Sequence, residues 1–131
     1  MDTDKKSKSV NSTLSGAKKH RLKNSETILN KSVLLILSEN YFGNSFIIDK
    51  PEIVIGRAKD CDLCIGDSFV SMRHCRIEID EDGKFYIEDL DSKNFTYLNR
   101  KQIKKKIHLL YGDRIVIGNT ILRFFLEEQI E

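Results

Sequence analysis

Residues 76–87 read RIEIDEDGKFYI, and this stretch holds the pattern that decides the fold class. Its two short runs, 76–79 and 85–87, are rich in β-branched or aromatic residues, and Asp82-Gly83 lies between them. β-Branched and aromatic side chains fit a pleated strand, whereas Gly and Asp favour the tight turns that join strands. The stretch therefore predicts two strands separated by a turn.

The same pattern recurs along the chain from residue 31 onward. Further short apolar runs lie at residues 33–37, 46–48, 53–55, 63–65, 97–98, 115–117 and 121–126. The gaps between the runs hold turn signals, such as residues 41–44 (YFGN) and Gly112-Asp113. Many short strands with closely spaced turn signals describe an all-β sandwich or barrel. Helical spacing is absent until residues 127–131, which we interpret as the start of a linker helix.

The 131 residues suffice for one folded core preceded by a tail. Residues 1–30 are rich in Ser, Thr, Lys and Asn and show no sustained period, so they cannot bury enough apolar area to offset the entropy of ordering. We therefore predict a disordered basic tail over 1–30 and one domain over 31–126. Residues 1–31 hold eight Lys/Arg against three Asp/Glu, which leaves 14 basic and 17 acidic residues for the remainder. The folded part lacks the basic face of a nucleic-acid binder.

Hydrophobic runs in this chain are short. None approaches the roughly 20 residues that a membrane helix needs. The first thirty residues also lack the continuous apolar stretch of a secretory signal. We therefore expect a cytoplasmic protein with no membrane partner.

The chain contains three cysteines, and Cys61, Cys64 and the His74-Cys75 pair admit a Cys₃His zinc site as an alternative. Two observations count against it. Cys64 alternates with Leu63 and Ile65 and should point to the opposite face, and His74 and Cys75 are adjacent on an extended segment, where both cannot easily ligate one metal. We expect no metal and no cofactor.

Catalytic signatures are also missing from the sequence. No paired carboxylates, nucleophile elbow or Gly-rich phosphate loop is present. His20 and His108 lie in the tail and in a strand-like stretch. We therefore predict a protein that is not an enzyme.

Three motifs follow one another in the middle of the chain. Gly56-Arg57 closes a predicted strand, residues 70–74 read VSMRH, and residues 92–99 read SKNFTYLN. In this order they resemble the forkhead-associated (FHA) family, whose signature is Gly-Arg, then Ser-x-x-His, then an Asn in a loop before a short strand. Residues 62–65 (DLCI) and 110–115 (LYGDRI) also match the family's landmarks. The resemblance covers roughly residues 33–126.

The resemblance implies a SMAD/FHA-like sandwich of two twisted, mostly antiparallel sheets with ligand loops at one end. It also implies a phosphothreonine-dependent signalling module whose partner is a Thr-phosphorylated protein or peptide. A phosphate monoester carries close to two negative charges and three acceptor oxygens. Its recognition therefore needs a fixed cation together with neutral donors.

Individual roles follow from the resemblance. Arg57 would supply the cation, Ser71 a hydroxyl to the phosphate, and Asn94 an amide that holds the peptide backbone. Gly56, His74 and Asn99 would support the loops without touching the ligand. Each binding residue also has a plainer interpretation: Arg57 as a surface ion pair, Ser71 as a turn cap, and Asn94 as a residue that tolerates left-handed φ.

Two positions depart from the family pattern, which usually has Thr before the Asn and Gly after it. This chain has Lys93 and Phe95 there. Lys93 removes a hydroxyl but offers an ammonium group to the phosphate. Phe95 cannot adopt the free φ of glycine cheaply, so we expect a reshaped loop around Asn94.

Further basic residues surround these motifs. Met72 is expected to contribute mainly its backbone to the ligand. Arg73 is counted with Arg57, Ser71, Met72, Lys93 and Asn94 among the phosphopeptide-binding residues. Arg73 and Arg76 either extend a positive rim or pair with the acids of residues 78–82. Residues 104–106 (KKK) are expected to form a solvated loop without a ligand role.

Three alternatives remain open at this point. The chain could serve as a phosphate-independent scaffold, because the loop around Asn94 is altered. Residues 121–131 resemble the exit of FHA domains that form the input of bacterial diguanylate cyclases, which would place a catalytic domain downstream. Thr3, Thr13 and Thr27 are possible phosphorylation sites, so the tail itself could occupy the pocket.

Overall fold

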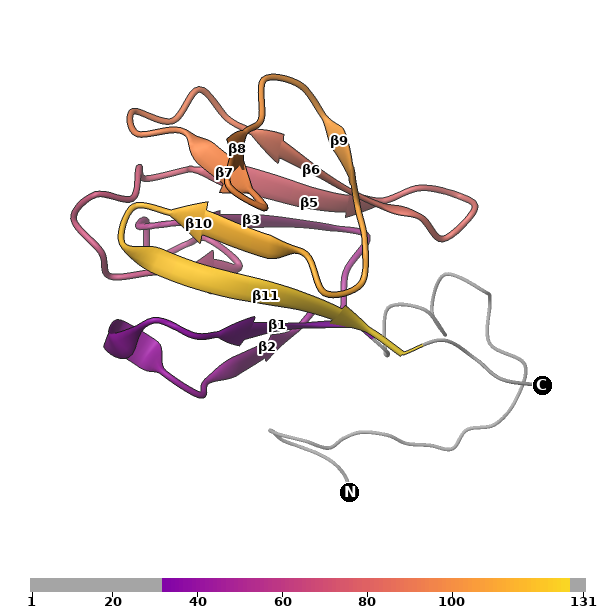
Figure 1. Ribbon diagram of the computed structural model, residues 1–131, viewed down its shortest axis with the longest axis horizontal. Coiled ribbons are helices and arrows are strands. Elements are labelled where there is room, and N and C mark those ends of the chain that lie inside the picture. Colours follow the sequence, from indigo (N-terminus) through magenta and orange to yellow (C-terminus); the bar gives the residue numbers. More distant parts are fainter. Residues whose placement is uncertain (1–31, 128–131) are drawn as a thin grey trace.

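The computed structural model describes residues 32–127, and these residues form two β-sheets packed face to face (Figure 1). In spatial order, the six-stranded sheet contains β2 (Ser45–Ile47), β1 (Ser32–Ile36), β11 (Thr120–Leu126), β10 (Arg114–Ile117), β7 (Thr96–Leu98) and β8 (Lys101–Gln102). The five-stranded sheet contains β4 (Leu63–Cys64), β3 (Glu52–Gly56), β5 (Cys75–Ile79), β6 (Phe85–Asp89) and β9 (Ile107–Leu109). A 3₁₀ turn, η1 (Glu39–Tyr41), connects β1 to β2.

Strands β5 and β6 are the two that residues 76–87 predict, and they pair antiparallel with Ile77 opposite Ile87. Their turn is closed by the carboxylate of Asp80, which accepts hydrogen bonds from the N–H groups of Asp82 and Lys84 over 2.9 Å each. Gly83 has a φ of 82°, a conformation that costs glycine little. The Asp-Gly signal therefore marks the turn for two physical reasons.

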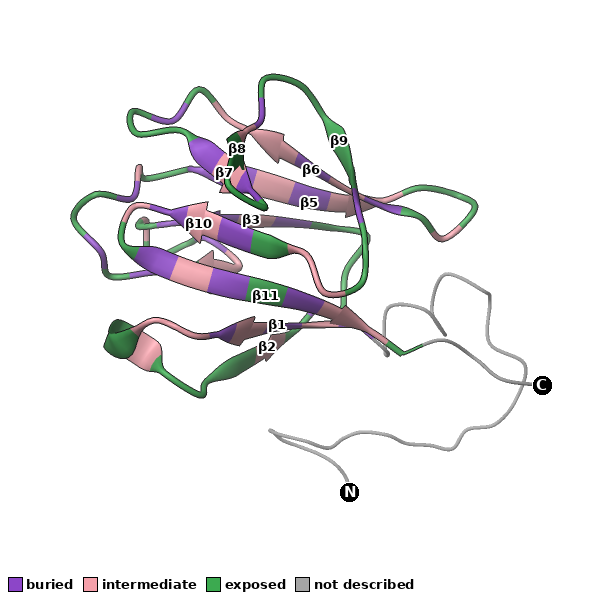
Figure 2. Cartoon of the chain, viewed as in Figure 1, coloured by how far each residue is buried: buried purple, intermediate pink, exposed green. Residues whose placement is uncertain are grey.

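Alternation along the strands builds the core. Successive side chains of a strand point to opposite faces, so every second residue is buried (Figure 2). Along β11, Leu122 and Phe124 are buried, whereas Arg123 between them is exposed. Phe124 meets Phe85 of the other sheet with ring centroids 5.0 Å apart, so the two inner faces interlock between the sheets.

The expectation of a two-sheet, mostly antiparallel sandwich is confirmed. Among the strand pairs of residues 32–127, β3 and β4 alone run parallel. The sequence did not predict β8 or η1, because neither Lys101–Gln102 nor Glu39–Tyr41 contains an apolar or β-branched run that would mark it. The tail over 1–30 and residues 128–131 of the predicted linker helix lie outside the described residues.

Between residues 32 and 127, no helix has the length and apolar character required to cross a membrane.

Candidate functional site

Several connections gather at one end of the sandwich, on the left in Figure 1, among them those between β3 and β4, β4 and β5, β6 and β7, and β10 and β11. Hydrogen bonds join them to one another. The N–H of Lys93 on the β6–β7 loop donates to the hydroxyl of Ser71 on the β4–β5 loop over 2.9 Å. The N–H of Asn119 on the β10–β11 turn donates to the carboxylate of Asp67 over 2.7 Å. The motif residues therefore meet in space although they are distant in sequence.

Arg57 begins the connection after β3 and its side chain is exposed. Its Nε donates to the carbonyl oxygen of Val70 over 2.9 Å, which fixes the direction of the guanidinium group. Within residues 32–127, its two terminal nitrogens donate no hydrogen bond and meet no carboxylate. The plainer interpretation of Arg57 as a surface ion pair is therefore not what the structure shows. A held but unneutralised guanidinium is suited to an anion.

Ser71 lies at the junction of three segments. Its carbonyl oxygen accepts from the N–H of Arg57 over 2.9 Å, and its hydroxyl oxygen accepts from the N–H of Lys93. Because that oxygen acts as an acceptor toward Lys93, the hydroxyl hydrogen remains available for a ligand oxygen. Lys93 itself is exposed and makes no ion pair with any described carboxylate.

His74 is fully buried behind Ser71. Its Nδ1 accepts from the N–H of Ser71 over 3.0 Å, and its Nε2 lies 2.8 Å from the carbonyl oxygen of Phe95. Since Nδ1 is an acceptor, the proton of the neutral ring is on Nε2, which donates to Phe95. One imidazole therefore connects the β4–β5 loop to the β6–β7 loop and leaves no nitrogen for a ligand.

Gly56 lets β3 approach the β4–β5 loop. A Cβ atom at this position would lie 2.2 Å from the carbonyl oxygen of Met72 and 2.9 Å from the Cα of Arg73. Met72 and Arg73 follow Ser71 on the surface, and within residues 32–127 neither of their backbone N–H groups donates a hydrogen bond. Successive free N–H groups on a turn form a small anion-binding concavity.

Asn94 and Phe95 form the tip of the β6–β7 loop, and both are exposed. The Nδ2 of Asn94 donates to the carbonyl oxygen of Phe69 over 2.9 Å, so one amide hydrogen and Oδ1 remain for a peptide. Phe95 has a φ of 68°. This is a left-handed backbone conformation, which a residue with a side chain adopts at a cost. The reshaping of the loop around Asn94 stays a prediction.

The two arginines near the motif have partners. Arg73 lies 2.8 Å from the carboxylate of Asp60, so its acid is not among residues 78–82. Arg76 lies on β5 and contacts Glu88 at 2.6 Å and Glu78 at 3.7 Å, which places it on the outer face of the five-stranded sheet. Arg76 therefore does not extend a positive rim at the loops.

Asn99 holds the turn between β7 and β8. Its Nδ2 donates to Asp113 over 2.8 Å, and its Oδ1 accepts from the N–H of Arg114 over 3.0 Å. Its φ is 50°, a conformation that asparagine tolerates better than most residues. Asn99 therefore ties one loop to β10 without approaching Arg57 or Ser71 through any of these bonds.

Sequence reasoning missed two carboxylates that fix the loops. Asp67 is buried and accepts from the N–H groups of Phe69 and Asn119 and from the hydroxyl of Thr120. Burial alone raises the pKa of Asp67, but the bonds from Phe69, Thr120 and Asn119 outweigh it, and the pKa lies below the ordinary value. An Asp two residues before an N–H donor is a turn signal that the sequence does carry.

Asp89 plays the same part for the β6–β7 loop. It accepts from the hydroxyls of Ser92 and Thr96 over 2.5 and 2.6 Å. The spacing of these residues spans the loop, so one carboxylate holds both of its ends. Asp67 and Asp89 were both passed over because they stand outside the recognised motifs.

The three cysteines differ in how far they are buried. Cys61 and Cys75 are buried and Cys64 is exposed. Burial raises the pKa of the Cys75 thiol, which keeps it protonated. Across residues 32–127, no group of three His, Cys, Asp or Glu side chains is arranged to hold a metal ion.

The site thus combines one oriented guanidinium, one hydroxyl, two free backbone N–H groups and one ammonium on loops that hydrogen bonds join to one another. These groups are all donors or cations. They suit a small, multiply charged oxyanion attached to a peptide, and they contain no nucleophile with an adjacent base.

The family model of the FHA domain matches residues 53–118 of the chain. Glycogen accumulation regulator GarA of Mycolicibacterium smegmatis is 37% identical over 82 residues, which are 63% of this chain and 51% of that protein. The oxoglutarate dehydrogenase inhibitor of Corynebacterium glutamicum is also 37% identical over 82 residues, 63% of this chain and 56% of the relative. The chain spans about half the length of these relatives.

Solved structures show the same fold. The FHA domain of CT664 from Chlamydia trachomatis superposes with a TM-score of 0.68 at 26% identity, covering 72% of this chain and 96% of that one. The FhaA FHA domain, solved in complex with the intracellular domain of Rv3910, gives a TM-score of 0.64 at 26% identity, covering 71% and 98%.

Proposed function

This chain belongs to the FHA domain family, and from that premise we propose that it binds a threonine-phosphorylated segment of a partner protein. Arg57 is proposed to pair with the phosphate, the Ser71 hydroxyl and the N–H of Met72 to donate to its oxygens, and Asn94 to hold the peptide backbone. Lys93 is proposed to add charge at the rim. Gly56, His74 and Asn99 are proposed as structural support.

The observation that carries this proposal is the state of Arg57. Its Nε is held by Val70, and its terminal nitrogens meet no acid among residues 32–127. A cation that is fixed and left without a counter-ion costs no rearrangement when a dianion arrives. Charge-assisted hydrogen bonds contribute about 1.5–3 kcal/mol each.

What is known of related proteins supports the proposal. EmbR of Mycobacterium tuberculosis has been solved in complex with a phosphopeptide, and FhaA with the intracellular domain of another protein. GarA is a regulator and the corynebacterial relatives are inhibitors of an enzyme. An FHA domain is a binding module, and we propose no catalysis for the described part of this chain.

A phosphothreonine peptide array tests the proposal. Peptides with degenerate flanks would be presented with phosphothreonine, phosphoserine or unmodified threonine at a fixed position. We expect retention of the phosphothreonine set alone. Equal retention of phosphorylated and unmodified peptides would favour the phosphate-independent scaffold instead.

Chain length limits which threonine of the tail could reach the binding loops of its own chain. Ser32 lies at the end of the sheet where it pairs with Leu126, and β11 runs from there to the loop end at Thr120, a span of about 20 Å at roughly 3.3 Å per residue. Thr27, five residues before Ser32, reaches at most about 18 Å. We therefore propose Thr3 or Thr13, and not Thr27, as a tail residue able to occupy the pocket of its own chain.

A cytoplasmic location and an input role beside a downstream diguanylate cyclase domain stay proposals of the same kind. Because the chain spans only about half the length of its relatives, a further domain is compatible with the match. A coding region for a cyclase domain directly after Glu131 would support the input role, and its absence from the gene would contradict it.

A further inference from the structure

The outer faces of the two sheets differ in chemistry. On the five-stranded sheet, Arg76 makes ion pairs with Glu52, Glu78 and Glu88, so this face is charged and internally neutralised. On the six-stranded sheet, the outward residues of the strands are largely apolar: Val33, Leu35, Ile47, Tyr97, Val116, Ile121 and Phe125. A solvent-facing side of an antiparallel sheet is normally polar. The outer face of the six-stranded sheet is therefore more apolar than a solvent-facing sheet normally is, and another segment packed on it would remove that apolar surface from water.

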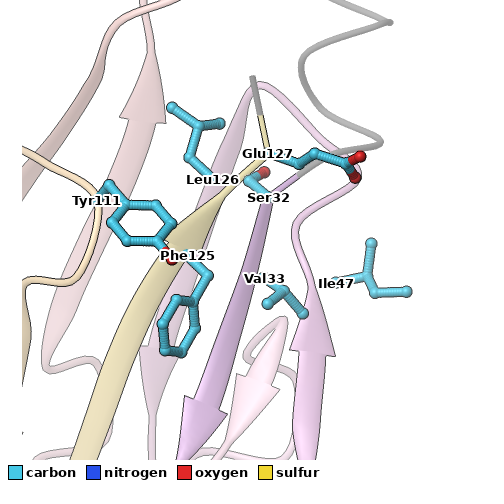
Figure 3. A pocket seen from close by; sticks show the side chains of 7 residues that line it. All are labelled: Ser32, Val33, Ile47, Tyr111, Phe125, Leu126 and Glu127. Carbon is cyan, nitrogen blue, oxygen red and sulfur yellow. The ribbon is translucent and has the colours of Figure 1, made fainter. Parts of the chain in front are cut away.

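This face is hollowed into a groove at the end of the sandwich away from Arg57. Figure 3 shows Phe125 and Val33 on adjacent strands, with Tyr111 on one side of them and Ile47 on the other. Val33 is the register partner of both Phe125 and Ile47, so the three side chains lie in one row across β11, β1 and β2. Ile47 is 49% exposed and Tyr111 68% exposed, and the edge of the Tyr111 ring meets Phe125 with centroids 5.6 Å apart.

The groove also contains the point where the chain enters the fold. Ser32, the first described residue, is part of its wall. The segment before it, residues 22–31, reads LKNSETILNK and includes Ile28 and Leu29. Ile28 precedes Ser32 by four residues and can lie at most about 14 Å from it. A tethered segment at this distance has an effective concentration in the millimolar range, which a free partner rarely matches.

A second copy of the chain is a poorer occupant of the same face. Arg114 and Arg123 are register partners on β10 and β11, and neither pairs with a carboxylate of residues 32–127. In a symmetric dimer each copy uses the same patch, so the two arginine pairs would be brought together. Like charges held opposite one another destabilise such a contact.

We propose that residues 22–31 fold back over the six-stranded sheet and that Ile28 and Leu29 fill the groove formed by Val33, Ile47 and Phe125. The chain would thus cover its own apolar face with its entry segment. Under this proposal, residues 1–21 would extend from the groove and not from Ser32. The binding loops at the other end are not involved.

Paramagnetic relaxation in the full chain tests this. Cys64 is the exposed cysteine of the described residues, so a Cys64→Ser, Ser25→Cys chain carries one reactive thiol for a nitroxide label there. We expect loss of the methyl signals of Val33 and Ile47 through broadening, with the signal of Val54 on the other sheet unchanged. The same labelled chain with Ile28→Asp and Leu29→Asp should recover the lost signals.

Val10→Asp with Leu14→Asp is the matched control, since it places the same two charges on aliphatic residues far from Ser32 in the sequence, and it should leave the broadening intact. Both changes fall outside the described residues, and unchanged signals of Ile77 check that the described domain is folded. Groove signals that stay sharp would overturn the proposal. It would also be overturned by broadening seen only between labelled and unlabelled copies, which would assign the groove to a dimer.

Discussion

The backbone N–H of Arg57 donates a hydrogen bond to the carbonyl oxygen of Ser71 over 2.9 Å. This bond joins the end of β3 to the β4–β5 loop and brings the proposed cation and the proposed hydroxyl to one place. A second bond, from the N–H of Ala58 to the carbonyl of Met72 over 3.1 Å, continues the pairing. The two segments are therefore held together by main-chain contacts before any ligand arrives, which lowers the entropic cost of binding.

Replacing Gly56 with alanine should disturb this junction. The added Cβ would lie 2.2 Å from the Met72 carbonyl oxygen, so β3 or the β4–β5 loop must move. Overpacking of this kind costs about 1–3 kcal/mol. Chemical denaturation of Gly56→Ala should show that loss of stability, together with weaker phosphopeptide binding. Ser68→Ala, an exposed change on the same loop, is the control and should alter neither quantity.

Asp67 should make stability depend on acidic pH. Its folded pKa lies below the ordinary carboxyl value of about 3.9, because hydrogen bonds to the ionised form outweigh burial. Its contribution is therefore complete above that value and is lost as the pH falls through the lower, folded pKa. Asp67→Asn should reduce stability at neutral pH by about 1–3 kcal/mol, since the amide keeps one acceptor oxygen and presents an NH₂ group to the donors that faced the other oxygen. The substitution should also flatten the fall in stability below about pH 4.

Asp80→Asn is the comparison for Asp67. Hydrogen bonding from the N–H of Lys84 also lowers the pKa of Asp80, but this carboxylate is exposed on the β5–β6 turn. Its replacement should cost less than that of Asp67. Equal losses for the two variants, measured by urea unfolding across pH, would contradict the assignment of Asp67 as the buried anchor of the loops.

Phe95→Gly should leave phosphopeptide affinity nearly unchanged. Phe95 already adopts a φ of 68°, so glycine would follow the same backbone path and keep the carbonyl oxygen beside His74. We expect dissociation constants within about a factor of three, a difference below 1 kcal/mol. A tenfold gain in affinity would mean that the phenyl ring obstructs the site.

Lys93→Ala should weaken phosphopeptide binding modestly. The ammonium group is exposed and free of ion pairs among the described residues, so it acts through a screened field. Exposed charge pairs contribute roughly 0.2–1 kcal/mol, which is up to about a fivefold change in affinity. Titrations at low and high salt should show a smaller salt effect for the variant. The same salt effect in both chains would remove Lys93 from the site.

Much of the fold was predictable because the strands carry a strong local pattern. Residues 76–87 predicted β5, β6 and their turn, because they contain β-branched residues and an Asp-Gly pair. Strand β8 has two residues, Lys101 and Gln102, and its existence depends on pairing with β7, which no local pattern reveals. Strands with an apolar run were thus predictable from the sequence, whereas a polar strand such as β8 depends on tertiary contacts.

Sequence reasoning likewise found some residues of the candidate site and missed others. Arg57, Ser71 and Asn94 were singled out because they stand in motifs that resemble a known family. The buried carboxylate of Asp67 was missed, since its partners include Thr120, which lies far off in the sequence. The half-buried carboxylate of Asp89 was missed because it stands outside the recognised motifs, although its partner Thr96 is near in the sequence. The apolar outer face of the six-stranded sheet was also missed. Alternation shows which residues share a face, but it does not show which face lacks a cover.

The most direct test of the central claim is a double-mutant cycle on Arg57 and Ser71 with one phosphothreonine peptide selected from the array. Each single alanine variant should lose about one to two orders of magnitude in affinity by calorimetry, as expected for one charge-assisted bond. The double variant should lose less than the sum, because both groups contact the same phosphate. Wild-type affinity in Arg57→Ala, or full additivity of the two changes, would contradict a shared phosphate site.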